Sequence, residues 1–339
     1  MDYINILKNA QRFLSRDIRF NPLTQMDVCK KNTLQETVKN QFAKFSKEDD
    51  EINTLIKGIK SINNVRCAHI IFTFLFGIYI YNKCEKIKKA VNKEVLEMLL
   101  LAGHPDDFSF LWFLICLFHD LGYTEENSQH EDRVGPCWAC NSKKLGAVDG
   151  VPEFYSKIYK NYFLYRKIEH GKTDHGIYAG LKMYPNLCRI RKNKANSPNG
   201  GWRQQLKHVY NYASWVVLAH NVYFTKDTKS ETCALYRKYS LEDLILETEG
   251  DSIKNYPIKQ SEHSVLFLFC LVDLIEPMKR IEEIECCDKI KFEICEDRII
   301  ISSDLDCTCV KNYLKGILDA KDWFAKVEQE DKRIIIPLQ

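Results

Sequence analysis

In the stretch FLICLFHDLGYTEE, residues 113 to 126, an apolar run is followed directly by a histidine and an aspartate. The run has the composition of a helix that is buried in a protein core. An ionised carboxylate in such surroundings is costly unless it is paired or coordinated. The doublet His119-Asp120 therefore predicts a partner for these two side chains inside the fold.

Three other apolar segments each contain one residue of a type that binds metals. His69 lies in NNVRCAHIIFTFLF, His220 in ASWVVLAHNVYF and Asp273 in VLFLFCLVDLIEP. Taken singly, a core histidine is usually satisfied by a backbone carbonyl, and a core aspartate by an arginine or a helix N-terminus. A shared divalent cation explains the whole set, because it neutralises the aspartates and uses the imidazole lone pairs.

The composition limits the class of protein. The chain has 339 residues, enough for one large domain or two ordinary ones. Its 49 basic and 46 acidic residues nearly cancel, which does not favour strong nonspecific binding of nucleic acid. The 14 cysteines are scattered and no secretory signal is evident, so we expect free thiols in a reducing cytoplasm. The apolar segments 70–82, 108–118 and 265–275 fall short of the roughly 18 to 20 residues of a membrane span, so we expect a soluble protein without membrane contact.

The hydrophobic pattern divides the chain into three parts. Residues 1–58 have helical spacing of apolar and charged positions and predict an N-terminal helical layer. Residues 59–283 contain long helical segments with little strand alternation. Residues 284–339 predict a small α+β module of order β-β-α-β, with strands in KIKFEICEDRIIISSDL and RIIIPL and a helix between them. The predicted fold is mostly α with this module at its C-terminal end.

The order of these polar residues resembles that of a known superfamily. His69, then His119-Asp120 in the context HDLG, then histidines in the region 170–220, then Asp273, is similar to the HD-domain superfamily of metal-dependent phosphohydrolases. The resemblance covers roughly residues 60 to 280. It implies an HD-domain helical bundle over residues 59–283.

The resemblance also implies the ligands. One metal ion is held by His69, His119, Asp120 and Asp273. In members with a second ion the aspartate of the doublet bridges the two, and His175 and His220 best match the two further histidines. His170 is the rival of His175, but only His175 is followed by small residues, Ala179 and Gly180, which let a helix pack closely.

A pair of divalent ions in such a site implies hydrolysis of a phosphate ester by a metal-activated hydroxide. Imidazole and carboxylate ligands admit Mn, Fe, Co, Ni or Zn, and Mg more weakly. The expected substrate is a phosphorylated small molecule, nucleotide-like in character. His119 and Asp120 are then the central catalytic residues.

Two basic residues are candidates for contact with the phosphate. Arg66 lies three residues before His69 and so on the same helical face; its alternative is an ion pair. Lys172 lies between His170 and His175; its alternative is a solvated loop lysine. Many relatives have a lysine directly after HD-x-G, where this chain has Tyr123, so a lysine-assisted step at that position is in doubt.

Two other functions compete with this one. The first is an HD-type single-strand nuclease, for which the basic loop RIRKNKANSPNGGWR, residues 189–203, would hold the strand beside Trp202. The second is a non-catalytic protein that senses a ligand through the C-terminal module.

The cysteines offer a second possible metal site. Cys137 and Cys140 have the spacing of a zinc knuckle with His130 nearby, and free thiols are the alternative. The later cysteines have irregular gaps that match no standard knuckle: Cys286, Cys287, Cys295, Cys307 and Cys309.

Overall fold

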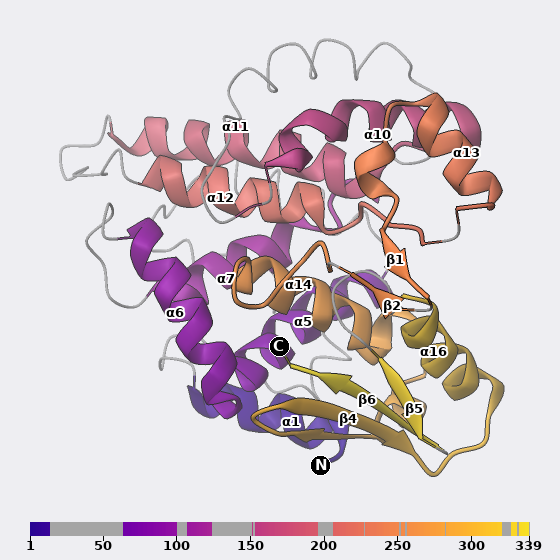
Figure 1. Cartoon of the computed structure of the whole chain (residues 1–339). Helices are drawn as coiled ribbons and strands as arrows, with labels where there is room; N and C mark the ends of the chain where they lie inside the picture. The colour runs from indigo at the N-terminus through magenta and orange to yellow at the C-terminus, as the bar shows by residue number, and fades with distance from the viewer. Residues whose placement is uncertain are drawn as a thin grey trace.

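The computed structural model is mostly helical, with a small antiparallel sheet near the C-terminus (Figure 1). It describes residues 1–13, 64–99, 107–123, 151, 153–195, 206–226, 228–250, 252–254, 256–281, 283–320, 327–330 and 332–338. Most of the predicted N-terminal layer lies outside these residues. Its described part is a short helix, α1 (Tyr3–Ala10), followed by the 3-10 turn η1 (Gln11–Phe13).

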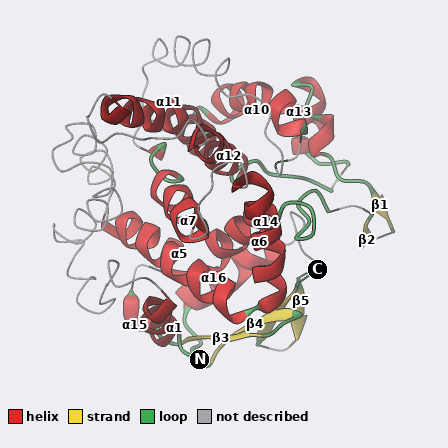
Figure 2. Ribbon diagram, turned by 90° about the vertical axis from the view of Figure 1, so that its left-hand side faces the viewer, coloured by secondary structure: helices red, strands yellow, loops and turns green. Residues whose placement is uncertain are grey.

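The centre of the molecule is formed by α5 (Asn64–Lys83), α7 (Asp107–Phe118) and α14 (Ser264–Ile275) (Figure 2). Every residue of α14 is buried, as its almost wholly apolar sequence requires. Among the described helices none is long and apolar enough to cross a bilayer. Both α7 and α14 are thus helices of a protein core, as predicted.

The start of α14 is held by a half-buried carboxylate of α6 (Glu85–Leu99). Glu94 accepts hydrogen bonds from the backbone N–H of Val265 at 2.9 Å and from the hydroxyl of Ser264 at 2.8 Å. Tyr212 donates a third bond to the same carboxylate at 2.7 Å. The first amides of a helix have no partner within the helix, so this carboxylate both satisfies them and favours the helix dipole.

A layer of three helices covers the other side of the centre: α10 (Phe154–His170), α11 (His175–Ala195) and α12 (Leu206–Ala219) (Figure 1). The predicted close packing of the helix after His175 occurs between α11 and α12. A side chain at Gly180 would place its Cβ 2.5 Å from the carbonyl oxygen of Ser214, which leaves room only for glycine.

The C-terminal sheet has the order β3-β4-β6-β5 and is antiparallel throughout. Its strands are β3 (Ile290–Ile294), β4 (Arg298–Ser303), β5 (Glu328–Glu330) and β6 (Arg333–Pro337), with α16 (Thr308–Asp319) between β4 and β5. The predicted order β-β-α-β was therefore wrong by one strand. The sequence of β5, Glu-Gln-Glu, has no apolar alternation, because it is a short polar edge strand, and such strands do not show in a hydrophobic pattern.

The first residues of the chain join the free edge of this sheet. The amino group of Met1 donates to the carbonyl of Phe292 at 2.8 Å, and the N–H of Phe292 donates back to the carbonyl of Met1 at 2.9 Å. Helix α16 is joined to the helical part by Tyr313, which donates to the carbonyl of Ile275 at the end of α14, at 2.6 Å. Among the described residues, the buried apolar side chains from Tyr3 to Leu338 form one cluster.

The remaining elements are short. They are α13 (Glu231–Lys238), η4 (Glu242–Leu244), β1 (Thr248–Glu249), β2 (Ser252–Ile253), η5 (Pro277–Lys279) and α15 (Ile284–Cys287). The β1–β2 hairpin lies in a region for which the sequence predicted only helices, and its strands are too short to show an alternating pattern.

Candidate metal centre

Five separate segments bring ligand-type side chains to one place in the interior. His69 lies within α5, His119 and Asp120 directly follow α7, and Asp273 lies near the end of α14. His175 is the first residue of α11, and His220 directly follows α12. All six side chains are buried, and His119 and Asp120 are fully so. We call these six residues the central cluster.

Three other members of the central cluster surround His119 Nε2. This atom lies 3.2 Å from His69 Nε2, 3.3 Å from Asp120 Oδ1 and 3.6 Å from Asp273 Oδ1. His69 Nε2 lies 3.1 Å from the same Asp273 oxygen. Ligands about 2.1 Å from one ion lie roughly 3–3.5 Å apart in tetrahedral or octahedral geometry. The spacing of these atoms therefore suits a single divalent cation.

The other two histidines, His175 and His220, lie on another side of Asp120 and His119. His175 Nε2 lies 3.9 Å from Asp120 Oδ1, and the His220 ring centre lies 5.6 Å from that of His119 and 5.4 Å from that of His175. Three buried atoms here have no hydrogen-bond partner among the described residues: Asp120 Oδ1, His175 Nε2 and His220 Nε2. Buried polar atoms are normally satisfied, so these three require an explanation.

Backbone carbonyls orient two of the imidazoles. His119 Nδ1 lies 2.7 Å from the carbonyl of Cys116, and His220 Nδ1 lies 2.5 Å from the carbonyl of Val217. A carbonyl only accepts, so in each ring Nδ1 carries the proton and Nε2 keeps its lone pair. Both lone pairs are therefore available to a cation at the centre of the cluster.

Glu276 orients the third imidazole, and the sequence did not single it out. This fully buried carboxylate lies 2.5 Å from His69 Nδ1 and accepts from the backbone N–H groups of Met278 and Lys279 and from the Tyr3 hydroxyl. A carboxylate that holds the outer nitrogen of a ligand histidine is common around metals. In the sequence, Glu276 stands three residues after Asp273 and directly before Pro277. This position alone looks like an ordinary helix end.

The electrostatics differ across the central cluster. Burial disfavours the charged form of His69, but hydrogen bonds to Asp273 and Glu276 outweigh this and raise its pKa to about 9. Burial lowers the pKa of His220 to about 4 and that of His175 well below its ordinary value. Both rings are thus neutral near pH 7, the form that can bind a cation.

The two aspartates of the central cluster are ionised. Burial raises the pKa of Asp120, but the neighbouring histidines and Arg66 outweigh it and hold that pKa well below the usual range. Burial has the same effect on Asp273, and the charge of Lys279 overcomes it, so the pKa of Asp273 is also low. The cluster therefore combines two ionised carboxylates with four histidine side chains.

Two cations lie at the partly exposed rim of the cluster. Arg66 Nη1 is 3.2 Å from Asp120 Oδ2, and Lys279 contacts Asp273 Oδ2; their side chains are 27% and 22% exposed. The Arg66 guanidinium also lies 3.6 Å from the centre of the Tyr123 ring, which stacks on His175 at 3.8 Å. Arg66 thus forms the ion pair that was its alternative reading, and the Tyr123 ring packs against His175.

The structure does not bring two of the predicted candidates into the cluster. Lys172 is exposed in the loop between α10 and α11, and no side-chain contact of the described residues joins it to the cluster. His170 ends α10 and pairs instead with the Tyr165 hydroxyl at 2.8 Å. Lys279, which the sequence did not single out, stands at the rim instead.

Gly122, between Asp120 and Tyr123, lies where the chain after α7 meets the start of α11. Its backbone lies so close to α11 that a Cβ would fall 1.9 Å from the carbonyl oxygen of His175. The glycine therefore permits the close approach that sets His175 beside Asp120.

Two predicted features lie outside the described residues. These are the possible zinc knuckle of Cys137 and Cys140 and most of the basic loop, including Trp202 and Arg203.

Comparisons with protein-family models, curated proteins and solved structures found no match. The described residues form a buried group, His69, His119 and Asp120, that could hold a metal ion. The donor set and the three unpartnered atoms both fit a divalent cation.

Proposed function

We propose that this protein is a metal-dependent phosphohydrolase of the HD type, with the central cluster as its active site. The observation that carries the proposal is the convergence of Asp120 Oδ1, His175 Nε2 and His220 Nε2, all buried and without hydrogen-bond partners among the described residues. A protein interior does not tolerate such atoms unless something else satisfies them, and a divalent cation satisfies lone pairs of all three.

The proposed ligands form two sets that share Asp120. His69, His119, Asp120 and Asp273 surround one position, and Asp120, His175 and His220 surround the other. When bound, divalent ions in a site of this kind lower the pKa of a water molecule and polarise a phosphoryl group. Nitrogen and carboxylate ligands admit Mn, Fe, Co, Ni or Zn, with Mg weaker.

The chain's own residues give the site its preference for anions. Arg66 and Lys279 are the partly exposed side chains that pair with the two ligand carboxylates, at 3.2 Å in the case of Arg66. If Asp120 and Asp273 coordinate metal ions, their negative charge is shared with those ions, and Arg66 and Lys279 can then bind an anionic substrate. An anion arriving at the rim therefore meets a guanidinium and an ammonium, groups that bind phosphate oxygens well.

The nucleotide-like character of the substrate rests on the resemblance to HD phosphohydrolases. The Tyr123 ring is an aromatic surface beside the site, but it already contacts His175 and the Arg66 guanidinium. The base of a nucleotide therefore has to bind elsewhere along the rim. We accordingly place the phosphate at Arg66 and Lys279 and leave the rest of the substrate to experiment.

Elemental analysis and a substrate panel test the proposal together. Purified protein is expected to contain one to two divalent ions per chain, and Mn²⁺ or Co²⁺ is expected to support hydrolysis of at least one member of a panel. The panel comprises nucleoside phosphates, cyclic nucleotides, sugar phosphates and short single strands. Cleavage of single strands alone identifies a nuclease. Metal binding with no hydrolysis of any member contradicts the enzyme and favours a ligand sensor. Absence of metal binding contradicts the metal-dependent enzyme.

Glu276→Gln is expected to weaken metal binding about 10- to 100-fold, because it removes the carboxylate that holds His69 Nδ1 at 2.5 Å. A glutamine can present its amide N–H to that nitrogen, which places the imidazole proton on Nε2 and removes the lone pair. Competition with a fluorescent chelator measures the affinity. Tyr3→Phe is the control, since it removes another partner of Glu276 but leaves the contact with His69. Equal loss in both variants would show that Glu276 acts through the fold alone.

A further inference from the structure

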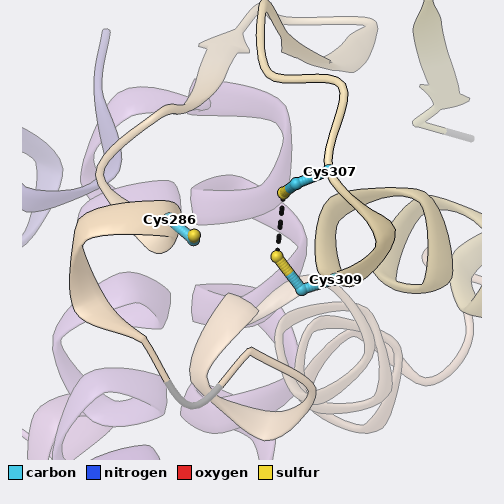
Figure 3. A group of neighbouring side chains, drawn as sticks. All are labelled: Cys286, Cys307 and Cys309. Atoms are coloured by element: carbon cyan, nitrogen blue, oxygen red, sulfur yellow. Dashed lines mark hydrogen bonds between the residues drawn. The ribbon is translucent and has the colours of Figure 1, made fainter.

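A second group of metal-type ligands lies in the C-terminal part of the chain, apart from the central cluster. Cys286 is in α15, and Cys307 and Cys309 are at the start of α16. Their sulfur atoms all lie within 4.8 Å of one another, and Cys307 Sγ is 2.9 Å from Cys309 Sγ. Figure 3 shows the three thiols directed toward one another from the two elements. All three are half-buried free thiols.

The irregular spacing that hid this group in the sequence has a structural cause. The β3–β4 hairpin lies between Cys286 and Cys307 and returns the chain to α15. Cys307 is the N-cap of α16, and Cys309 is in the first turn, so the two thiols emerge on the same side of the helix start. Their gaps match no standard knuckle, as the sequence indicated, and it is the hairpin that brings three of them together.

The neighbouring Cys287 does not belong to the group of Cys286, Cys307 and Cys309. Its side chain is buried and points to the carbonyl of Ile281 and the sulfur of Met278, each at 3.4 Å. Cys295, on the same module, lies beside Glu293. Neither takes part in the group, although both are close in sequence to Cys286.

The geometry points to a site for a thiophilic divalent cation, Zn²⁺ in the first place, held by Cys286, Cys307 and Cys309. Zinc ligands at 2.3 Å place tetrahedral sulfurs roughly 3.8 Å apart, between the 2.9 Å of the closest pair and the 4.8 Å limit of the group. A modest rotation of the side chains therefore gives equal separations.

A carboxylate is available as the fourth ligand. Glu283 Oε2 lies 3.3 Å from Cys286 Sγ, on the exposed side of the group. Three thiolates and one carboxylate form a donor set that zinc accepts, and the soft thiolates distinguish it from the imidazole and carboxylate donors of the central cluster.

A cation here would join two parts of the chain that carry the central cluster and the sheet. The segment from Glu276 to Cys287 holds His69 and Asp273 through Glu276 and Lys279, and α16 packs against the end of α14 through Tyr313. Binding links the start of α16 to α15, so it is expected to stabilise the folded chain by mass action.

Cobalt spectroscopy on the full chain tests this site independently of any activity. Metal-free protein, kept reduced, is titrated with Co²⁺, and a thiolate-to-cobalt charge-transfer absorption in the near ultraviolet is expected, which imidazole and carboxylate ligands do not produce. The absorption is expected to persist in Asp120→Asn and in Cys295→Ser, and to fall by more than half in Cys309→Ser. Zn²⁺ is expected to displace Co²⁺ and to raise the melting temperature of the wild type by a few degrees more than that of Cys309→Ser.

Other outcomes overturn the proposal. One is no charge-transfer absorption in reduced wild type, and another is absorption that survives in both Cys286→Ser and Cys309→Ser. Thiol titration of the unfolded protein gives the third: if two of these three thiols are missing in freshly purified protein and return on reduction, the group is a disulfide pair and not a metal site. None of these results depends on the proposed hydrolase function, whose failure would appear instead in the substrate panel.

Discussion

Asp120→Asn is expected to remove the divalent ions of the central cluster and to lower kcat/KM at least about 10³-fold. Metal ions contribute several kcal/mol to stabilisation of a phosphoryl-transfer transition state, and each 1.36 kcal/mol is a factor of ten in rate. Asp120 is the ligand that both proposed positions share, with Oδ1 at 3.3 Å from His119 Nε2 and 3.9 Å from His175 Nε2. Its loss therefore affects both.

The substitution acts through the orientation of the amide. Arg66 Nη1 lies 3.2 Å from Asp120 Oδ2 and only donates hydrogen bonds, so the amide oxygen of an asparagine turns to Arg66. The NH₂ group then faces the centre of the cluster, where it offers no lone pair to a cation. The side chain keeps its size, which limits the effect on packing.

Elemental analysis and steady-state kinetics at saturating Mn²⁺ measure these two losses. Glu94→Gln is the matched control, because it converts a half-buried carboxylate to its amide at the start of α14, outside the central cluster. It is expected to lower the melting temperature while the protein keeps its metal. Retention of both metal and activity in Asp120→Asn would refute the proposed site.

His175→Gln is expected to lower the metal stoichiometry by one ion and the rate by about 10²–10³-fold, whereas His170→Gln is expected to change neither. The loss of rate follows from removal of one of the electrostatic groups that act on the transition state. His175 Nε2 is buried without a hydrogen-bond partner among the described residues and faces Asp120, and His170 contacts Tyr165 at the end of α10. The two histidines are close in sequence but differ in what surrounds them.

A titration of metal-free protein with Mn²⁺, followed by calorimetry, measures the stoichiometry. The pair of variants tests the assignment directly, since the same substitution is made at two histidines of one short region. Loss of an ion in His170→Gln, with none lost in His175→Gln, would reverse the assignment. Loss of all metal in His175→Gln would show that one ion only is bound and that His175 is among its ligands.

Several residues of the central cluster were predictable because their signal is local. His69, His119 and Asp273 each interrupt an apolar run, and a polar group in such a run needs a partner wherever the run folds. The small residue Gly180 likewise indicated close helix packing, and the structure shows it against Ser214. Burial is a property of the segment itself, so the sequence contains it.

Other residues were not predictable because their role depends on what faces them. Glu276 looks like an ordinary helix end until α5 places His69 beside it. The sequence singled out Lys172 and not Lys279, yet the fold places Lys279 at the rim of the cluster and leaves Lys172 exposed. Only contacts between distant segments separate these cases.

The sequence by itself determined that the protein is mostly helical, with a small sheet near its C-terminus and ligand-type side chains in its most buried helices. It did so because hydrophobic periodicity and the cost of burying charge act within a segment. The tertiary structure alone decided that Gly122 admits His175, that Glu276 lies beside His69, and that Cys286 meets Cys307 and Cys309 across a hairpin. Those relations are distances between segments far apart in the chain, and they are set by packing, which no local pattern records.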